Sequence, residues 1–331
     1  MFEKIFDINT EAEQTNLLSL RKGVIIGAGQ VGLACAYSLL IQNCFDELVL
    51  QDINTKKIEG EVMDLLHGMS FIAPTELVAG TVADAGKDAD IVIITAGAAQ
   101  KPGETRLDLL GRNVAIYQNL LDDVAKYCPH AILLIVTNPV DIMTYVALKM
   151  SGFPSSRVIG TGTVLDTSRF RSLLAHKLNI DARSVQAYII GEHGDSEVPV
   201  WSTANVAGRK LLSQDWENLD SAEREYFTAI FSQVKNVGYE IIQRKGYTSY
   251  AIGLAVTDIV EAIIRSQKRI LTVSGLVDGL YGIKDVCLGL PRVINEKGFY
   301  KTVNLDLSPR EEKQLRHSAN VLQDVFARLK L

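Results

Sequence analysis

Cysteine is scarce in this chain, and its few cysteines are scattered. The 331 residues include four cysteines, Cys35, Cys44, Cys128 and Cys287, and none of them stands in Cys-x-x-Cys spacing. A zinc site or a redox dithiol requires closely spaced thiols, so this spacing argues against both. We therefore expect no bound metal and four free thiols in a reducing cytoplasm.

Long runs of one kind of side chain are also missing. The formal net charge is −5 and no run of Lys and Arg stands out, which argues against nucleic acid or an anionic membrane as the main partner. No window reaches about eighteen uninterrupted apolar residues, so no membrane span is expected. The first twenty residues carry four acids and no continuous apolar core, unlike a signal peptide. We expect a cytoplasmic protein.

The composition is that of a globular protein. Hydrophobic residues make up 47% of the chain and charged residues 22%, which is ordinary for a folded protein and unlike a disordered one. A chain of this length can form two lobes, each with its own core. We predict an N-terminal arm over residues 1–20, a first domain over 21–160 and a second domain over 161–331.

Short apolar runs alternate with amphipathic stretches in the first domain. The runs KGVIIG, ELVLQD, ADIVIITAG and AILLIVTN are rich in Val and Ile, as is typical of parallel strands covered on both faces. Helical spacing of apolar residues predicts helices within 58–66 and 108–127. The alternation predicts an α/β fold with a Rossmann-type, doubly wound parallel sheet.

The second domain has a different pattern of predicted helices and strands. Helices are expected at 164–179, 221–244 and 249–265, with strand pairs near 185–190 and within 269–302. A last helix is expected to begin after Ser308, a serine N-cap followed by Pro309 at the first helical position. Its apolar stripe comprises Leu315, Ala319, Leu322, Phe326 and Leu329. We predict a mixed α+β domain.

A glycine-rich segment follows the first predicted strand. It reads Gly27-Ala28-Gly29-Gln30-Val31-Gly32 and leads into a predicted helix. Gly27 would permit a tight turn, Gly29 a close approach of the backbone to a pyrophosphate, and Gly32 close packing of helix and strand. The free N–H groups of the helix would favour the phosphates. Such a segment alone is a weak signal, but its context predicts a dinucleotide site.

Asp52 ends the second predicted strand, 20 residues after Gly32. A carboxylate there can bind both ribose hydroxyls and would repel a 2′-phosphate, which favours NAD over NADP as cofactor. Alternatively, Asp52 only caps the helix that follows it. The glycines upstream favour the cofactor role.

Five further segments carry charged and polar residues suited to dehydrogenase chemistry. They are AGAAQKPGETRLDLLGRN (96–113), VTNPVD (136–141), LDTSRFR (165–171), GEHGDSE (191–197) and KGYTS (245–249). With the glycine segment, they resemble the lactate/malate dehydrogenase family in order and spacing, from about residue 22 to the C-terminus, and its L-lactate branch most closely. The resemblance implies an NAD-dependent enzyme that moves a hydride between nicotinamide and C2 of a 2-oxo acid.

The resemblance assigns the central catalytic roles to three residues. An imidazole can give a proton to a carbonyl oxygen and take it back at physiological pH, and His193 receives this acid/base role. Asp166 would fix the tautomer of His193 and stabilise its charged form. Arg169 would hold the substrate carboxylate with two parallel hydrogen bonds. Taken alone, His193 could be a surface histidine, and Asp166 and Arg169 a surface ion pair.

The resemblance implies four more substrate contacts. Arg106, in a loop suited to closing over a substrate, would polarise the reacting carbonyl. Asn138 would donate a hydrogen bond to the substrate. Thr248 would line the side-chain pocket of the substrate, and it could also be the N-cap of the next helix. Malate dehydrogenases have an arginine where this chain has Gln100. Because Gln100 is uncharged, the second carboxylate of oxaloacetate would be buried unpaired, which is costly and favours pyruvate and lactate.

The resemblance also implies the wider cofactor site and an assembly. The implied cofactor contacts are Gly27, Gly29, Val31, Gly32, Asp52, Lys57, Gly97, Ala98, Asn119, Val136 and Asn138. The family is commonly tetrameric, so a homotetramer is expected. Many bacterial members are activated by fructose 1,6-bisphosphate through an arginine and a histidine at a subunit interface. Arg171 matches that arginine, but Gln186 replaces the histidine, so we expect weak or absent activation.

We expect pyruvate and lactate as substrates, in fermentation at the end of glycolysis, and two alternatives stay open. The first is a malate or branched-chain 2-hydroxy acid dehydrogenase, which a panel of oxo acids would distinguish. The second is a non-enzymatic NAD-binding protein, which predicts loss of the proton donor or of the carboxylate clamp. His193 and Arg169 are both present, which argues against this second alternative.

Overall fold

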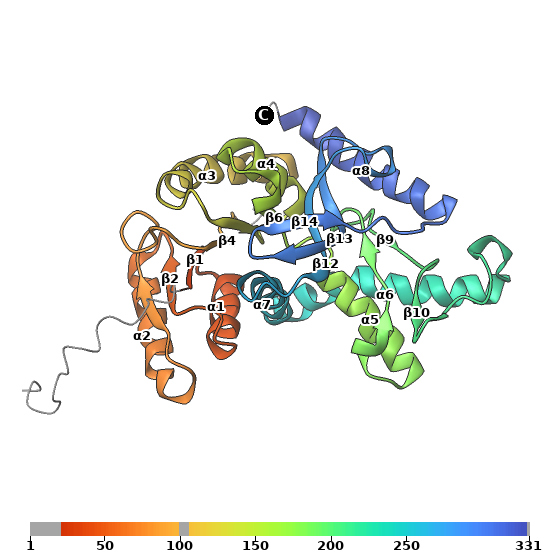
Figure 1. The fold of residues 1–331 in the computed structure, drawn as a ribbon, viewed down its shortest axis with the longest axis horizontal. Coiled ribbons are helices and arrows are strands. Elements are labelled where there is room, and N and C mark those ends of the chain that lie inside the picture. Colours follow the sequence, from red (N-terminus) through yellow and green to blue (C-terminus); the bar gives the residue numbers. More distant parts are fainter. Residues whose placement is uncertain (1–20, 99–105, 330–331) are drawn as a thin grey trace, which may run out of the picture.

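A large twisted sheet runs through the middle of the molecule, with helices on both of its faces (Figure 1). The computed structural model describes residues 21–98 and 106–329, so the predicted N-terminal arm over residues 1–20 lies outside the described residues. Within the described ranges, no helix combines the length and the apolar character needed to cross a bilayer.

The first half of the chain forms the parallel part of the sheet. Its strands are β1 (Lys22–Ile26), β2 (Glu47–Gln51), β3 (Glu76–Ala79), β4 (Ile91–Ile94), β5 (Ile132–Ile135) and β6 (Val158–Gly160). They lie in the order β6-β5-β4-β1-β2-β3 and pair in parallel. Between them lie α1 (Gln30–Ile41), α2 (Thr55–His67), α3 (Arg106–Tyr127) and α4 (Val140–Ser151). This is the Rossmann strand order, so the predicted fold class is confirmed.

The second half adds antiparallel strands to the same sheet. β12 (Arg269–Val277) pairs with β6 where Ser274 lies opposite Gly160, and β13 (Val286–Asn295) and β14 (Gly298–Thr302) extend the sheet outward. The helices are α5 (Val164–Leu178), α6 (Ser221–Lys245), α7 (Tyr250–Ile264) and α8 (Pro309–Leu329). Two small sheets contain β7 (Val185–Gln186), β8 (Ile189–Ile190), β9 (Val198–Pro199), β10 (Asn205–Val206) and β11 (Arg209–Lys210).

Alternate residues of the central strands face opposite helix layers, as the pleat of a strand requires. Ile25, Ile93 and Leu134 pack with α1, α2 and α7 on one face. Ile94 and Leu133 pack with α3, α4 and α8 on the other. Because both faces are covered, the strands read as continuous apolar runs rather than alternating ones. A third cluster, centred on the ring pair Phe170–Trp201, joins α5 to α6.

The last helix begins where the sequence predicts. α8 starts at Pro309, the Ser308 hydroxyl accepts the Glu311 N–H at 3.3 Å, and a Glu311 carboxylate oxygen accepts the Ser308 N–H at 2.9 Å. This reciprocal pair is a capping box. The apolar stripe of α8 packs inward through the buried side chains Leu315, Ala319 and Leu322.

The parallel strands place several predicted site residues at one edge of the sheet. The glycine segment follows β1, Asp52 follows β2, Gly97 follows β4 and Asn138 follows β5. In a doubly wound sheet, a crevice forms outside the carboxyl ends of the strands where the strand order reverses, here between β1 and β4.

Candidate active site

The three glycines after β1 differ in the structural reason for having no side chain. Gly27 has φ +104°, and a Cβ on it would lie 2.5 Å from the backbone nitrogen of Ala96. A Cβ on Gly32 would lie 1.9 Å from the Gly27 carbonyl oxygen, whereas a Cβ on Gly29 would meet no atom within 4 Å. Gly27 and Gly32 are therefore required by the fold. Gly29 faces open space at the N-terminus of α1, where a pyrophosphate can approach the backbone closely.

Asp52 braces the glycine segment from the end of β2. One of its carboxylate oxygens accepts the Ala28 N–H at 2.7 Å, and the other accepts the Asn54 N–H at 2.9 Å. The cap of α2 is Asn54, which accepts the Lys57 N–H, so Asp52 does not cap that helix. The Lys57 ammonium donates to the Ala28 carbonyl at 3.1 Å. Asp52 and Lys57 thus both contact the glycine segment, beside which their implied cofactor role requires them to lie.

The loop after β4 is held by a residue that the sequence analysis did not single out. Asn113, on α3, is 1% exposed. Its side-chain oxygen accepts the Ala98 N–H at 2.7 Å, and its side-chain nitrogen donates to the Asn138 carbonyl at 3.4 Å. Asn113 therefore ties the loop after β4 to the loop after β5. Asn119 lies on the exposed side of α3.

A cavity of about 790 Å³ opens beside the loop after β5. Its walls come from α3, α5, α6, α7, α8 and the loop that contains His193. The predicted residues that line it are Val136, Asn138, Asp166, Arg169, His193 and Thr248. Residues more than 100 positions apart in the sequence thus meet in one cavity, as the resemblance implied.

His193, Asp166 and Arg169 form one connected ion cluster in this cavity. The imidazole Nδ1 lies 2.6 Å from one Asp166 oxygen, and Arg169 Nη1 donates to the other at 2.9 Å. The Asp166 side chain is 4% exposed, that of Arg169 18% and that of His193 29%. Asp166 and Arg169 are therefore not a surface ion pair. One guanidinium nitrogen is engaged with Asp166, so a substrate carboxylate would use the others.

The cluster favours the protonated imidazole. The negative charge of Asp166, only partly opposed by burial, raises the pKa of His193 from 6.5 to about 9. Burial alone would raise the pKa of Asp166, but His193 and Arg169 together lower it below its ordinary value. Asp166 therefore stays ionised and holds the proton on His193 at neutral pH.

Glu197 is a second buried acid of the cavity, within the GEHGDSE segment. Its residue is 7% exposed, and one of its carboxylate oxygens is buried without a hydrogen-bond partner among the described residues. Burial, and then the charge of Asp166, raise the pKa of Glu197 to about 8. Glu197 is therefore mostly neutral at pH 7, which lowers the cost of leaving that oxygen unpaired.

The loop that contains His193 is anchored from several directions. Gly191 and Gly289 of β13 exchange two backbone hydrogen bonds, at 2.8 and 2.9 Å. Ser318 of α8 is fully buried and accepts the Glu192 N–H at 2.8 Å. The Lys235 ammonium of α6 donates to the Asp195 carbonyl at 2.7 Å. These anchors lie far away in sequence, so no local motif could indicate them.

Thr248 lies on the cavity wall between α6 and α7. α6 ends at Lys245 and is capped by Gly246, which has φ +91°, and α7 begins after Ser249, which occupies the N-cap position. Thr248 is therefore not the N-cap of α7, and its small hydroxyl side chain is available to shape the cavity.

Two of the implied substrate contacts fall outside the described side chains. Gln100 lies outside the described residues, and so does the side chain of Arg106, although Arg106 is the first residue of α3.

The described residues, 21–98 and 106–329, contain no group of three or more His, Cys, Asp or Glu residues that could hold a metal ion.

The residues of the implied regulatory site, Arg171 and Gln186, do not line the cavity. Arg171 donates through Nε to the Ala187 carbonyl at 2.9 Å, and its guanidinium lies 5.0 Å from the centre of the Tyr188 ring. Gln186 is exposed on β7 and pairs with Asn205. Arg171 is thus held by a backbone and a ring contact, and Gln186 carries no charge.

Known proteins resemble this chain over nearly its whole length. Residues 21–160 match the family model of the lactate/malate dehydrogenase NAD binding domain, and residues 163–330 match that of the lactate/malate dehydrogenase alpha/beta C-terminal domain. The L-lactate dehydrogenase of Gloeobacter violaceus is 58% identical over 307 residues, 93% of each chain. That of Synechococcus sp. is 55% identical over 92% of this chain and 98% of its own.

Solved structures show the same likeness. The minor L-lactate dehydrogenase from Enterococcus mundtii, crystallised in a ligands-bound form, superposes with a TM-score of 0.88 at 42% identity, covering 94% of this chain and 99% of the other. A lactate dehydrogenase from a Medee basin deep-sea metagenome library gives a TM-score of 0.89 at 43% identity, with the same coverage.

Proposed function

The chain belongs to the lactate/malate dehydrogenase family, and we propose that it reduces pyruvate to (S)-lactate with NADH, reversibly. The family predicted from the sequence motifs and its NAD cofactor are thereby confirmed. The observation that carries the proposal is the buried His193–Asp166–Arg169 cluster on the wall of one cavity. It combines a proton donor with a carboxylate clamp, which a non-enzymatic NAD-binding protein would not need.

The first domain has the features that a dinucleotide requires. We propose that the open backbone at Gly29 and the free N–H groups of α1 bind the pyrophosphate, and that Asp52 binds the ribose. Lys57, Gly97, Ala98, Asn119 and Val136 stay proposed contacts of the cofactor. When bound, NADH supplies the hydride that C2 of pyruvate accepts.

His193 supplies the proton in the reduction. Its Nδ1 is engaged by Asp166, which leaves Nε2 as the nitrogen that faces the substrate carbonyl oxygen. Because the pKa of His193 is raised to about 9, the imidazolium is the resting form at neutral pH and can protonate that oxygen as negative charge develops on it. In the reverse direction the neutral imidazole takes the proton back.

Arg169 and Asn138 orient the oxo acid. The carboxylate of pyruvate binds the guanidinium N–H groups of Arg169 that Asp166 does not use, and Asn138 donates to the substrate from the loop after β5. Thr248 leaves room for the methyl group. We propose that Arg106 completes the site by stabilising the charge that develops on the reacting oxygen.

Gln100 sets the choice of oxo acid in this proposal. A dicarboxylate would bring a second anion into a cavity whose cluster already pairs one substrate carboxylate, and an uncharged amide cannot pair another. If this costs about 4 kcal/mol in the transition state, pyruvate is favoured over oxaloacetate roughly a thousandfold.

A substrate panel tests the proposal. NADH consumption by the purified full chain is followed with pyruvate, oxaloacetate and 2-oxoisocaproate. We expect pyruvate to give the highest kcat/KM by a wide margin. A higher value for oxaloacetate or for the branched-chain acid would replace lactate dehydrogenase activity with one of the two alternatives within the family.

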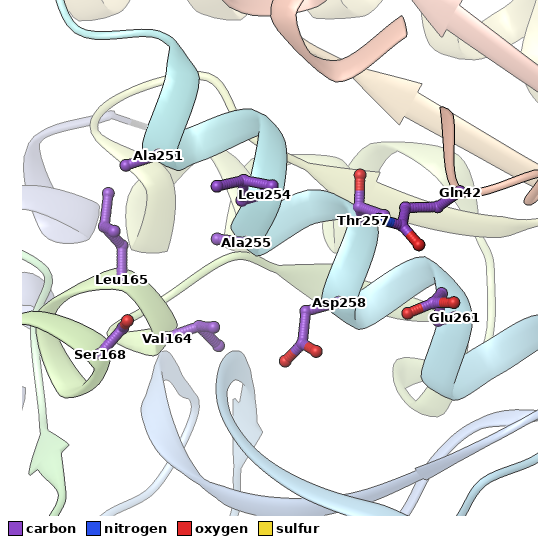
Figure 2. Close-up of a pocket in the computed structure, with 10 residues that line it drawn as sticks. All are labelled: Gln42, Val164, Leu165, Ser168, Ala251, Leu254, Ala255, Thr257, Asp258 and Glu261. Carbon is purple, nitrogen blue, oxygen red and sulfur yellow. The ribbon is translucent and has the colours of Figure 1, made fainter. Parts of the chain in front are cut away.

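We also propose a homotetramer. A pocket of about 450 Å³ lies between α5 and α7. Figure 2 shows Leu165 and Ser168 on one side of it and Ala251 and Leu254 on the other. Leu254 is 62% exposed in the single chain, and large apolar side chains are also exposed on α1 and α2, at Tyr37, Ile41, Met63 and Leu66. Light scattering on the purified protein tests the assembly, and the mass of a monomer or of a dimer would contradict the tetramer.

The proposed tetramer has no strong response to fructose 1,6-bisphosphate, because Gln186 cannot pair with a phosphate as a histidinium does. A clear fall in the KM for pyruvate on adding the bisphosphate would contradict this.

We further propose that residues 21–160 form the cofactor domain and 161–331 the substrate domain. The enzyme would work in the cytoplasm, where glycolysis supplies its substrates.

A further inference from the structure

Among the described residues, four acids line the cavity, and three of them have a hydrogen-bond donor or a cation beside them. The four are Asp166, Glu192, Asp195 and Glu197. Asp166 is bonded to the imidazole and the guanidinium of the ion cluster, and Glu192 accepts the Ser196 N–H at 3.3 Å. Asp195 faces the Lys235 ammonium at 3.6 Å.

Glu197, the fourth acid, is buried beside the same ion cluster without such a partner. Its residue is 7% exposed, and its Oε1 has no hydrogen-bond partner within the part of the chain that the structure describes. The charges of the ion cluster and of Lys235 all act on its carboxyl. Because an ionised carboxylate is costly to bury without a donor, the protonated acid is the stable form at neutral pH.

A bound substrate adds a negative charge to this part of the cavity. In the proposed function the substrate carboxylate binds Arg169, whose charge also acts on Glu197. An ionised Glu197 would repel this carboxylate, whereas a neutral Glu197 would not. Binding of the oxo acid therefore favours the protonated form of Glu197.

We propose that Glu197 controls the affinity of the site for the substrate carboxylate, which it admits while protonated and repels once ionised. Pyruvate or lactate then binds with partial uptake of a proton from solvent by Glu197. The inference rests on the proposed function, in which Arg169 binds the substrate carboxylate. It goes beyond that function because the protonation state of a second group, besides His193, affects turnover.

Ionisable groups from every element around Glu197 contribute to the charge of the cavity. They are Asp166 and Arg169 of α5, Glu192, His193 and Asp195 of the catalytic loop, Lys235 and Tyr239 of α6, and His317 of α8. These groups are the same in the wild type and in Glu197→Gln, so their own titration largely cancels when the two proteins are compared.

The pH range of the test follows from the titration of Glu197. Burial, and then the charge of Asp166, raise the pKa of Glu197 to about 8. Its ionised fraction therefore rises from about a tenth at pH 7 to about nine tenths at pH 9. Substrate affinity should be full near pH 7 and decline toward pH 9.

Binding of oxamate to the full chain saturated with NADH tests the proposal. Oxamate has the carboxylate of pyruvate, but an amide replaces its ketone, so it binds without accepting a hydride. Glu197→Gln keeps the size of the side chain and removes its charge at every pH. If ionisation weakens binding about fivefold, a repulsion of about 1 kcal/mol, the ratio of wild-type Kd to variant Kd rises about threefold from pH 7 to pH 9.

Asp195→Asn is the matched control for a lost charge. Asp195 lies on the same loop, but its side chain is 63% exposed, and an exposed carboxylate is ionised at both pH values. The ratio of wild-type Kd to Asp195→Asn Kd should therefore not change with pH. A ratio that stays flat for Glu197→Gln, or that rises equally for Asp195→Asn, would overturn the proposal.

Proton uptake on binding gives an independent measure. Calorimetry at pH 8 in two buffers of different ionisation enthalpy should show that the wild type takes up about a third of a proton more than Glu197→Gln when oxamate binds. Equal uptake would contradict the proposal. If Glu197→Gln does not fold, Glu197→Met, which is similar in size and uncharged, serves in the same comparisons.

Kinetics separate Glu197 from His193. Lactate and pyruvate share the carboxylate, so at pH 9 the KM for both should be lower in Glu197→Gln than in the wild type, with kcat little changed. The neutral form of His193 instead slows reduction and favours oxidation. A lower KM for only one of the two substrates would contradict the role of Glu197.

Infrared spectroscopy tests Glu197 without any ligand. A protonated carboxyl group absorbs at higher frequency than a carboxylate, and the spectrum of the wild type minus that of Glu197→Gln isolates this residue. We expect a protonated carboxyl band at pH 7 that declines toward pH 9. If oxamate does not bind, the proposed function fails while this titration still tests Glu197. Absence of the band at pH 7 would overturn the proposal.

Discussion

Asp166→Asn separates the charge of Asp166 from its shape. The charge of Asp166 is the largest cause that raises the pKa of His193 from 6.5 to about 9. If the variant returned His193 fully to its ordinary pKa, the protonated fraction at pH 8 would fall from about 90% to about 3%. Since pyruvate reduction requires the imidazolium, kcat/KM at pH 8 would fall by up to about thirtyfold from protonation alone.

The pH dependence of the loss in kcat/KM identifies the cause of that loss. Near pH 6 both proteins would be mostly protonated, so the protonation loss shrinks to less than about twofold. Any further loss from a misaligned imidazole is independent of pH and adds a constant factor. Asp141 and Glu197 also raise the pKa of His193, so thirtyfold is the upper limit for Asp166.

The assay is NADH consumption with pyruvate from pH 6 to pH 9, expressed as the ratio of wild-type to variant kcat/KM. Asp195→Asn is the control, because Asp195 lies on the same loop but has a side chain that is 63% exposed and faces Lys235. The ratio should rise with pH for Asp166→Asn and stay flat for Asp195→Asn. A ratio that does not change with pH in Asp166→Asn would refute the assignment of charge to Asp166.

Other substitutions test the remaining parts of the site. His193→Gln should abolish turnover while NADH binding, measured by calorimetry, persists; lost cofactor affinity would mean that the residue is misassigned. Gln100→Arg should move kcat/KM from pyruvate toward oxaloacetate, and an unchanged preference would count against the charge argument. Gly29→Ala should weaken NADH binding without lowering Tm, because its Cβ meets no protein atom, whereas Gly32→Ala should lower Tm through its clash with the Gly27 carbonyl. Equal Tm values in the two glycine variants would contradict the roles assigned to them.

The sequence predicts those parts of the fold that depend on local patterns. β1, β2, β4 and β5 are buried on both faces and so read as apolar runs, and the glycine segment lies between a strand and a helix as the pattern requires. β3 has only one buried residue, Leu77, so it does not read as a continuous apolar run, and β6, with three residues, is too short to stand out. α4 is buried almost all round, so it lacks the polar face that marks an amphipathic helix.

The catalytic cluster could be predicted only through the family resemblance. His193 and Asp166 are 27 residues apart, and Asn138 and Thr248, which line the same cavity, are 110 apart. Contacts at such separations depend on how the strands are ordered in the sheet, and no spacing along the chain encodes them. The sequence does not indicate that the parallel sheet continues into β12. A single residue pair, Ser274 and Gly160, joins β12 to β6, and these two residues are also far apart in the sequence.

The central claim is that one group, His193, gives the proton in pyruvate reduction and takes it in lactate oxidation. The direct test is the pH profile of kcat/KM for both directions with the wild-type enzyme. Because the pKa of His193 is raised to about 9, reduction should be constant at neutral pH and fall as the pH rises through about 9. Lactate oxidation should rise over the same range. Profiles that fall together, or an apparent pKa below that of a free histidine, would contradict the account.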